Sequence, residues 1–223
     1  MNAFLGKESP RPRRAREASE RATAINFEKE SRNMHFILDC DDVLLDWQRG
    51  FRHWVYANHG IKPSAKGPKS WSLFTWLGQP EARCMELIAA FNASQGFGEL
   101  YAMDGAIDAV AKLHAAGHRM TVLTSCSADP VAVRRRKQNL RQVFGVMLNR
   151  VVCLDLGESK AGWLEVLNDG IWIEDNYKNA MMGLKAGHKT FMMRRRHNRD
   201  DEKATDSRIV WIDNWRPIVS LFS

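Results

Sequence analysis

The stretch Phe36-Ile37-Leu38-Asp39-Cys40-Asp41-Asp42-Val43 sets three apolar residues directly before two aspartates that stand two positions apart. A short apolar run that ends in polar residues is typical of a strand buried inside a parallel sheet. Side chains two positions apart in extended backbone point to the same side, so Asp39 and Asp41 are expected to face one pocket. In open parallel sheets, ligands bind beyond the carboxyl ends of the strands, and this stretch therefore predicts where a site would lie.

Five further apolar runs follow this first strand, and segments with helical spacing separate them. The runs are Met120–Leu123, Val151–Leu154, Ile171–Ile173, Thr190–Met193 and Ile209–Ile212. Regular alternation of strands and helices is typical of the α/β class. We therefore predict a three-layer, Rossmann-like parallel sheet with helices on both faces.

Two segments break the alternation. Residues 45–100 hold helical stretches around a loop rich in Gly, Pro, Lys and Ser, which predicts a small α-helical cap inserted into a core formed by residues 34–44 and 101–223. Residues 1–33 contain eight Lys or Arg, five Asp or Glu and few large apolar residues, and we expect a basic, disordered N-terminal extension there. Met34 is an alternative start for the natural chain because it closely precedes the first strand.

The composition of the 223 residues is that of an ordinary globular protein, with 44% hydrophobic and 26% charged residues. No apolar run reaches the roughly 18–20 residues that span a bilayer, so no membrane partner is expected. The four cysteines lie far apart, and reduced thiols in a cytoplasmic protein are expected rather than a disulfide framework or a zinc site. The formal charge of +7 indicates an anionic partner, but the charge alone does not choose between nucleic acid, nucleotide and membrane surface, of which we expect no membrane.

A second acidic cluster, Glu174-Asp175, ends the strand Ile171–Ile173. Carboxylates from two strands at one sheet edge would repel each other unless a cation lay between them, and oxygen ligands of this kind suit Mg²⁺. Thr124-Ser125 ends another strand and offers two hydroxyls to phosphate oxygens. Lys160 opens a helical segment before the acidic strand and can supply a positive charge to the same pocket.

Together and in this order, these motifs resemble those of the haloacid dehalogenase (HAD) superfamily of phosphohydrolases. The matching stretches are Ile37–Val43, Thr124, Lys160 and Ile173–Asn176. Within the superfamily, the chain is most similar to the 5′(3′)-deoxyribonucleotidase group through looser likenesses. These are Asp39–Trp47, Phe97–Ala106, Leu123–Ser125, His197-Asn198 and Trp211–Trp215. The chain departs from the group at Asp42, where glycine is usual, and in the loop around Trp71.

The resemblance implies a Mg²⁺-dependent phosphomonoester hydrolase, most like a 5′-nucleotidase that acts on (deoxy)nucleoside monophosphates. Asp39 would attack phosphorus and form an aspartyl-phosphate, and Asp41 would protonate the leaving alcohol and then activate water. The other implied roles are phosphate binding by Thr124, Ser125 and Lys160, stacking on a base by Trp47, and Mg²⁺ binding by Asp39, the Asp41 main-chain oxygen, Asp175 and, through water, Glu174.

Plainer interpretations stay open for several residues. Asp46 is expected to cap the next helix, and Asp42 to be solvated or to act as a cap. Trp47 suits core packing as well as base stacking. The clusters Arg134–Lys137 and Arg194–Arg196 are expected to be solvated, with an anion-attracting rim as the functional alternative. They also motivate two other functions, a phosphatase that acts on nucleic-acid ends and a non-catalytic nucleic-acid-binding protein.

Overall fold

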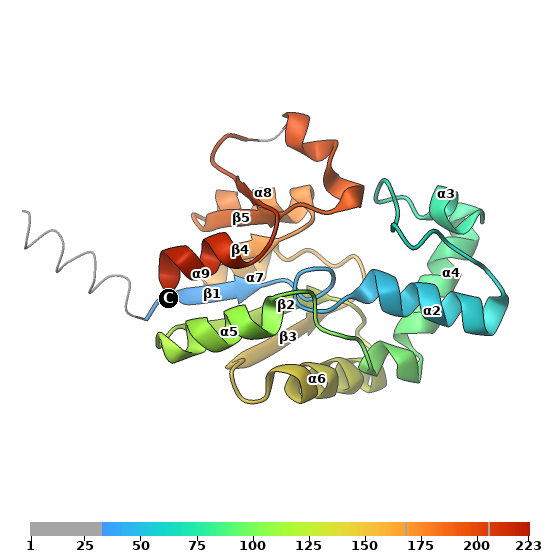
Figure 1. Ribbon diagram of the computed structural model, residues 1–223, viewed down its shortest axis with the longest axis horizontal. Helices are drawn as coiled ribbons and strands as arrows, with labels where there is room; N and C mark the ends of the chain where they lie inside the picture. The colour runs from blue at the N-terminus through green and yellow to red at the C-terminus, as the bar shows by residue number, and fades with distance from the viewer. Residues whose placement is uncertain (1–32, 168, 205) are drawn as a thin grey trace, which may run out of the picture.

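The computed structural model describes residues 33–167, 169–204 and 206–223, and these form a six-stranded parallel sheet (Figure 1). The expectation of a disordered extension at 1–33 lies outside the described residues except for residue 33. The strands are β1 (His35–Leu38), β2 (Arg119–Ser125), β3 (Arg150–Leu154), β4 (Ile171–Glu174), β5 (Lys189–Met193) and β6 (Val210–Ile212). Each strand coincides with an apolar run of the sequence, and the predicted α/β fold with a Rossmann-like parallel sheet is confirmed.

Helices cover both faces of this sheet (Figure 1). One face carries α5 (Ala106–Ala115), α6 (Pro130–Phe144) and α9 (Arg216–Phe222), and the other carries α7 (Ala161–Val166) and α8 (Tyr177–Lys185). The alternation of side chains along β1 explains the two layers. Phe36 and Leu38 belong to the apolar core under α5, α6 and α9, whereas Ile37 packs with Trp172 in the core on the α7 side. Across the described part of the chain, no helix combines the length and the apolar character needed to cross a membrane.

In the strand order β3-β2-β1-β4-β5-β6, the side on which successive strands are added reverses between β1 and β4. The chain builds outward from β1 through β2 and β3, and then returns to the other side of β1 to form β4, β5 and β6. At such a switch point the loops that follow the two central strands diverge and open a crevice at the carboxyl edge of the sheet. Asp39 follows β1 and Glu174 ends β4, so the two acidic clusters meet at this crevice.

Three helices, which we call the cap helices, stand beyond the carboxyl ends of the strands (Figure 1). They are α2 (Trp47–His59), α3 (Phe74–Leu77) and α4 (Glu81–Asn92), and the 3-10 turn η1 (Gln95–Gly98) leads from α4 back to the sheet. At the start of α2, Asp46 Oδ1 accepts a hydrogen bond from Arg49 N at 3.0 Å, which confirms the expected capping role. The ring centroids of Trp47, Phe51 and Phe91 lie 4.5–5.7 Å from one another, and these rings form an aromatic core that α2 and α4 share.

Candidate active site

A pocket of about 280 Å³ lies between the carboxyl edge of the sheet and the cap helices. The eight site residues predicted from the sequence all line it: Asp39, Asp41, Trp47, Thr124, Ser125, Lys160, Glu174 and Asp175. They come from distant parts of the chain because parallel strands deliver their carboxyl ends to one edge. Among the described residues that line the pocket, five are aspartate or glutamate and one is lysine, so acidic side chains outnumber basic ones there.

Lys160 is a buried cation that joins the two acidic clusters. Its Nζ lies 2.6 Å from Asp39 Oδ1 and 2.8 Å from Glu174 Oε2, and its side chain is 3% exposed. Glu174 Oε1 in turn accepts hydrogen bonds from the main-chain N–H groups of Asp175 and Asn176. Burial and the neighbouring Glu174 carboxylate raise the pKa of Asp39 to about 7, and Lys160 opposes this only in part. The positive charge of Lys160 is therefore too small to balance this edge of the sheet.

Asp41 pairs with a buried arginine. Its Oδ1 lies 2.6 Å from Arg136 Nη2 on α6, and the Arg136 side chain is fully buried. Burial raises the pKa of Asp41 to about 6, with Arg136 acting in the opposite direction. The expectation that Arg134–Lys137 is solvated is wrong for Arg136. The helical spacing from Ala132 and to Leu140 places Arg136 on the buried face of α6.

Asp42 stands in the turn that carries Asp41. Its φ of 58° is a left-handed conformation, which glycine adopts most easily and aspartate better than most other residues. A glycine at this position would adopt the same conformation without strain. Asp42 Oδ1 accepts a hydrogen bond from Gln48 N in the first turn of α2, so the capping interpretation is confirmed. The solvated interpretation is wrong because the side chain is buried, and burial together with Asp175 raises the pKa of Asp42 to about 7.

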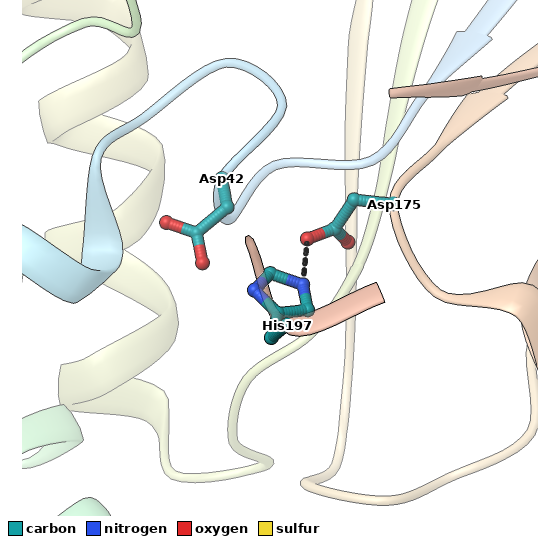
Figure 2. Close-up of side chains that lie close together, drawn as sticks. All are labelled: Asp42, Asp175 and His197. Atoms are coloured by element: carbon teal, nitrogen blue, oxygen red, sulfur yellow. Dashed lines mark hydrogen bonds and ion pairs between the residues drawn. The ribbon is translucent and has the colours of Figure 1, made fainter. Parts of the chain in front are cut away.

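A histidine outside the four main motifs, His197, lies beside Asp42 and Asp175 at the carboxyl edge of the sheet (Figure 2). His197 Nε2 lies 2.9 Å from Asp175 Oδ2. Gln48 Nε2 lies 2.7 Å from His197 Nδ1. The Gln48 amide donates to Nδ1, which leaves the proton on Nε2 for donation to Asp175. The next residue, Asn198, donates to the main-chain oxygens of Asp175 at 2.7 Å and Met193 at 2.8 Å. The segment after β5 thus holds both the side chain and the main chain of Asp175.

The second arginine cluster, Arg194–Arg196, holds loops together. Arg194 forms an ion pair with Glu202 at 2.7 Å. Arg195 Nε donates to the main-chain oxygen of Asp42 at 2.6 Å, and Arg196 Nη1 donates to that of Gly67 at 2.8 Å. These contacts tie the segment after β5 to the turn after β1 and to the loop between α2 and α3. The expectation of a fully solvated face is therefore wrong for this cluster, because its three arginines are partly buried and bound to neighbouring loops. Its alternative role as an anion-attracting rim stays a prediction.

The two hydroxyl residues at the end of β2 have different surroundings. Thr124 is buried and borders the pocket. Ser125 Oγ donates to the main-chain oxygen of Glu158 at 3.1 Å, and this hydrogen bond ties β2 to the loop that carries Lys160. Donation from Ser125 to a phosphate would require the hydroxyl to exchange this acceptor for another.

Two tryptophans from the cap side border the pocket. Trp47 Nε1 donates to Asn92 Oδ1 at 3.1 Å, and Asn92 Nδ2 donates to the main-chain oxygen of Cys126 at 3.0 Å, which links the cap helices to the end of β2. Trp71 is 45% exposed, and its ring centroid lies 4.2 Å from that of His197. Trp47 both packs within the cap and borders the pocket, so its geometry agrees with each of the two interpretations.

The donor set at the sheet edge fits a divalent cation. Asp39, Glu174 and Asp175 each offer one oxygen, and these oxygens lie within 4.8 Å of one another. A second group, formed by Asp42, Asp175 and His197, meets the same limit and shares Asp175 (Figure 2). Mg²⁺ prefers oxygen ligands, so the all-carboxylate group suits it better than the group with an imidazole. A cation there would also offset the negative charge that Lys160 leaves unbalanced.

The chain is similar to known proteins in structure, but no similarity in sequence is found. No family model matches the chain, and no curated protein matches it. A haloacid dehalogenase-like family hydrolase from Streptococcus pneumoniae is similar, with a TM-score of 0.62 at 12% identity over 86% of this chain and 100% of that chain. YfnB of Bacillus subtilis, described as a HAD hydrolase bound to magnesium, gives a TM-score of 0.58 at 11% identity, covering 86% and 99%. The chain has the HAD-like fold.

A further structure with the HAD-like fold contains a small phosphate ester. It is a mutant of CbbY from Rhodobacter sphaeroides in complex with xylulose-1,5-bisphosphate, with a TM-score of 0.53 at 15% identity over 82% of this chain and 95% of that chain. At these identities the likeness concerns the fold alone. The chemistry of the present chain is therefore argued from its own pocket residues.

The pKa shifts predict how the metal-free protein responds to pH. Asp39 and Asp42 have pKa values raised to about 7, against about 3.9 for an aspartate in an unfolded chain. Between about pH 4 and about pH 7 the folded chain holds protons that the unfolded chain releases, so stability falls as the pH rises through that window. Mg²⁺ bound to the ionised carboxylates would oppose this loss. We expect saturating Mg²⁺ to raise Tm by about 3–6 °C near pH 7.5 and by less than about 1 °C near pH 5.

Thermal unfolding of the full chain with and without Mg²⁺ at the two pH values measures this difference. Asp175→Asn removes a carboxylate from the proposed site and should abolish the Mg²⁺-dependent shift. Asp108→Asn makes the same change on the exposed side of α5 and should preserve it. Equal shifts at both pH values, or a shift that survives Asp175→Asn, would contradict a metal site built from these carboxylates.

Proposed function

We propose that this chain is a Mg²⁺-dependent phosphomonoester hydrolase in which Asp39 forms an aspartyl-phosphate. The observation that carries the proposal is the buried contact of Lys160 with both Asp39 and Glu174, at 2.6 Å and 2.8 Å, in a pocket that also contains Thr124 and Asp175. A carboxylate nucleophile needs nearby positive charge, both to remain ionised and to receive an anionic phosphate. Lys160 supplies part of this charge at the nucleophile itself.

The proposed reaction has two steps, and Asp41 gives up one proton in the first step and takes one back in the second. Asp39 attacks phosphorus, the bond between phosphorus and the ester oxygen breaks, and Asp41 gives its proton to the leaving alcohol. Water then attacks the aspartyl-phosphate and gives a proton to Asp41, and phosphate leaves as the Asp39 carboxylate is restored. The pKa of about 6 suits Asp41 for both roles near neutral pH. Thr124, Ser125 and Lys160 are proposed to bind the non-bridging phosphate oxygens.

The proposed Mg²⁺ ligands are Asp39, the main-chain oxygen of Asp41 and Asp175, with Glu174 acting through water. Mg²⁺ bound there would screen the repulsion between the attacking carboxylate and the phosphate. The magnesium in the Bacillus subtilis structure supports this choice of ion. Orientation of Asp175 by His197, whose Nε2 lies 2.9 Å from Asp175 Oδ2, is the kind of outer contact that holds a metal ligand in place.

We propose a small phosphomonoester as substrate, with a (deoxy)nucleoside monophosphate as the most specific form of the proposal. Residues 45–100 would act as a cap over a core of 34–44 and 101–223 and would contact the leaving group. Trp47 and Trp71 border the pocket and offer apolar rings to a base, and stacking of this kind contributes about 1–3 kcal/mol per base. The sugar bisphosphate bound to the Rhodobacter sphaeroides protein agrees with a small phosphate ester as ligand of this fold.

The alternatives that involve nucleic acid have less support than the sequence suggested. Arg136 is buried against Asp41, and Arg195 and Arg196 donate hydrogen bonds to neighbouring loops. In the first cluster, Arg134 and Lys137 are the exposed members. The basic side chains near the pocket are thus largely committed to internal contacts, which favours a small substrate over a nucleic-acid end.

A panel of phosphomonoesters tests the proposal. It contains ribo- and deoxynucleoside 5′- and 3′-phosphates, sugar phosphates and terminally phosphorylated oligonucleotides, and phosphate release is measured with Mg²⁺ and with excess chelator. We expect turnover of at least one mononucleotide with Mg²⁺ and a loss of at least about 100-fold with the chelator. Release from no member of the panel would contradict the proposal. A preference for oligonucleotides with a steep salt dependence would support the nucleic-acid alternative instead.

A further inference from the structure

Arg136 is the most deeply buried charged side chain near the pocket. Its side chain is 0% exposed, and its Nη2 lies 2.6 Å from Asp41 Oδ1, whose side chain is 27% exposed. The guanidinium carbon lies 3.9 Å from the centre of the Phe97 ring. Its Nε, Nη1 and Nη2 have no hydrogen-bond partner among the residues that the structure describes, and neither has Asp41 Oδ1, so the contact between the two side chains is an ion pair. An arginine with so few polar contacts is costly to bury, so its one ion pair with a carboxylate requires a reason.

The surroundings of Arg136 hold it in one place. Arg136 and Asn139 lie on the buried face of α6, and Asn139 makes hydrogen bonds to both main-chain groups of Leu100, at 3.1 Å and 3.0 Å. η1 lies so close to α6 that a Cβ atom at Gly98 would come within 3.2 Å of Arg135 Cβ. The guanidinium is therefore fixed between α6 and the segment that leads back from the cap helices.

Asp41 is constrained by this fixed guanidinium. The turn that carries it is closed by hydrogen bonds from Leu44 N and Leu45 N to the main-chain oxygen of Cys40, at 2.8 Å and 2.9 Å. Its Oδ1 is buried against Arg136, whereas the residue as a whole borders the pocket. Oδ2 is thus the oxygen left to exchange a proton. Arg136 itself is not among the residues that line the pocket, so it reaches a substrate only through Asp41.

We propose that Arg136 is a positioning residue that anchors Asp41 Oδ1 and so aims Oδ2 at the leaving oxygen of the substrate. This inference rests on the proposed phosphomonoester hydrolysis. It assigns to a residue of the first arginine cluster a role in proton transfer and none in attracting anions. It also explains why the arginine is buried, because a solvated side chain could not hold the carboxylate in one orientation.

Leaving groups of different acidity distinguish positioning from a merely structural role. An alkyl phosphate needs a proton on its leaving oxygen, whereas the p-nitrophenolate of p-nitrophenyl phosphate leaves without one. We expect Arg136→Met to lower kcat/KM for an alkyl phosphate by about 100-fold or more and for p-nitrophenyl phosphate by less than about 10-fold. The ratio kcat/KM reports phosphoryl transfer to Asp39 and is insensitive to the later hydrolysis. Arg136→Lys keeps the charge and should recover part of the loss.

Arg134→Met is the matched control because it removes an exposed arginine from the same helix. It should leave the ratio between the two substrates unchanged. An equal loss on both substrates in Arg136→Met, or no loss on either, would overturn the positioning role. In an Asp41→Asn background, Arg136→Met should cause no further selective loss, because the group that it positions is already absent.

Thermal unfolding tests the pair without relying on turnover. Asp41→Asn leaves the buried guanidinium without its carboxylate, and we expect Tm to fall by about 5–10 °C. Adding Arg136→Met to Asp41→Asn should lower Tm no further. A strictly additive double variant would overturn the pairing whatever the activity. If the wild-type chain hydrolyses no phosphomonoester while the Tm values are non-additive, the proposed function fails but the pairing stands.

Discussion

Asp39→Asn is expected to reduce phosphate release by at least about 10⁴-fold, the largest effect that the structure predicts. The amide is nearly isosteric with the carboxylate, but it cannot form the acyl-phosphate bond. Asp39 is buried at the end of β1 beside Lys160. Two other carboxylates of the pocket are held by other side chains, and we assign neither of them the attack on phosphorus. Asp41 pairs with Arg136, and Asp175 pairs with His197. Initial rates at saturating substrate and Mg²⁺ measure the effect.

Asp46→Asn provides the matched control for this variant. It makes the same change of acid to amide seven positions further along, and asparagine also serves as a helix N-cap. Its rate should stay within about twofold of the wild type and its Tm near that of the wild type. Asp39→Asn removes a partner of the buried Lys160, so its folded fraction is measured by unfolding and used to correct its rate. Substantial activity in Asp39→Asn would contradict the assignment of the nucleophile, even if the chain proved to be a phosphatase.

Lys160→Met is expected to reduce kcat/KM by about 10²–10³-fold. The variant removes the cation that contacts both Asp39 and Glu174, at 2.6 Å and 2.8 Å, and that is proposed to receive a phosphate oxygen. Without it the pKa of Asp39 should rise further, because burial and Glu174 would then be opposed only by the hydrogen bond from the Cys40 main chain. The loss of activity should therefore be larger near pH 6 than near pH 8, since less of the nucleophile is ionised at the lower pH.

Lys112→Met serves as control because Lys112 forms an exposed ion pair with Asp108 on α5, away from the pocket. Its kcat/KM should match that of the wild type. Since removal of one partner from a buried ion pair costs about 3–5 kcal/mol, the folded fraction of Lys160→Met must be measured by unfolding and used to correct the rates. Corrected activity within about threefold of the wild type would contradict a role for Lys160 in the reaction.

Much of this site was predictable from sequence because parallel strands end at one edge. Asp39, Thr124 and Glu174 are separated by long stretches of chain, but each ends or follows a short apolar run. The alternation of strands and helices places such residues together once the sheet is parallel. The capping role of Asp46 was predictable for a similarly local reason, since the residue stands directly before a helix.

The contacts that surround these residues were not predictable, because they depend on the burial of individual side chains. Arg136 lies within a run of four basic residues whose charge suggests a solvated face, but the packing of α6 against the sheet buries this one member. Helical spacing from Ala132 to Leu140 was the signal that could have indicated it. His197 belongs to a segment without regular spacing, and only its likeness to a short family stretch singled it out.

We propose that the cap side of the pocket selects the substrate, and this is the part of the chain where the sequence is least informative. Trp71 lies in the loop between α2 and α3, is 45% exposed and contacts His197, an arrangement that follows from the path of two loops and from no local pattern. The same loop is fixed by Arg196, which donates to the main-chain oxygen of Gly67. Loops of this kind position side chains through long-range contacts. The shape of the pocket on the cap side could therefore not be predicted from the sequence.

We propose that Asp39 carries the phosphoryl group during turnover, and trapping of the phosphorylated intermediate tests this most directly. The chain is mixed with Mg²⁺ and a phosphomonoester labelled in its phosphate, quenched in acid within milliseconds, reduced with borohydride and digested for mass spectrometry. We predict label on the wild-type chain, conversion of Asp39 to homoserine in the peptide that contains it, and neither result in Asp39→Asn. Rapid turnover without acid-stable label, or modification at a residue other than Asp39, would contradict the account.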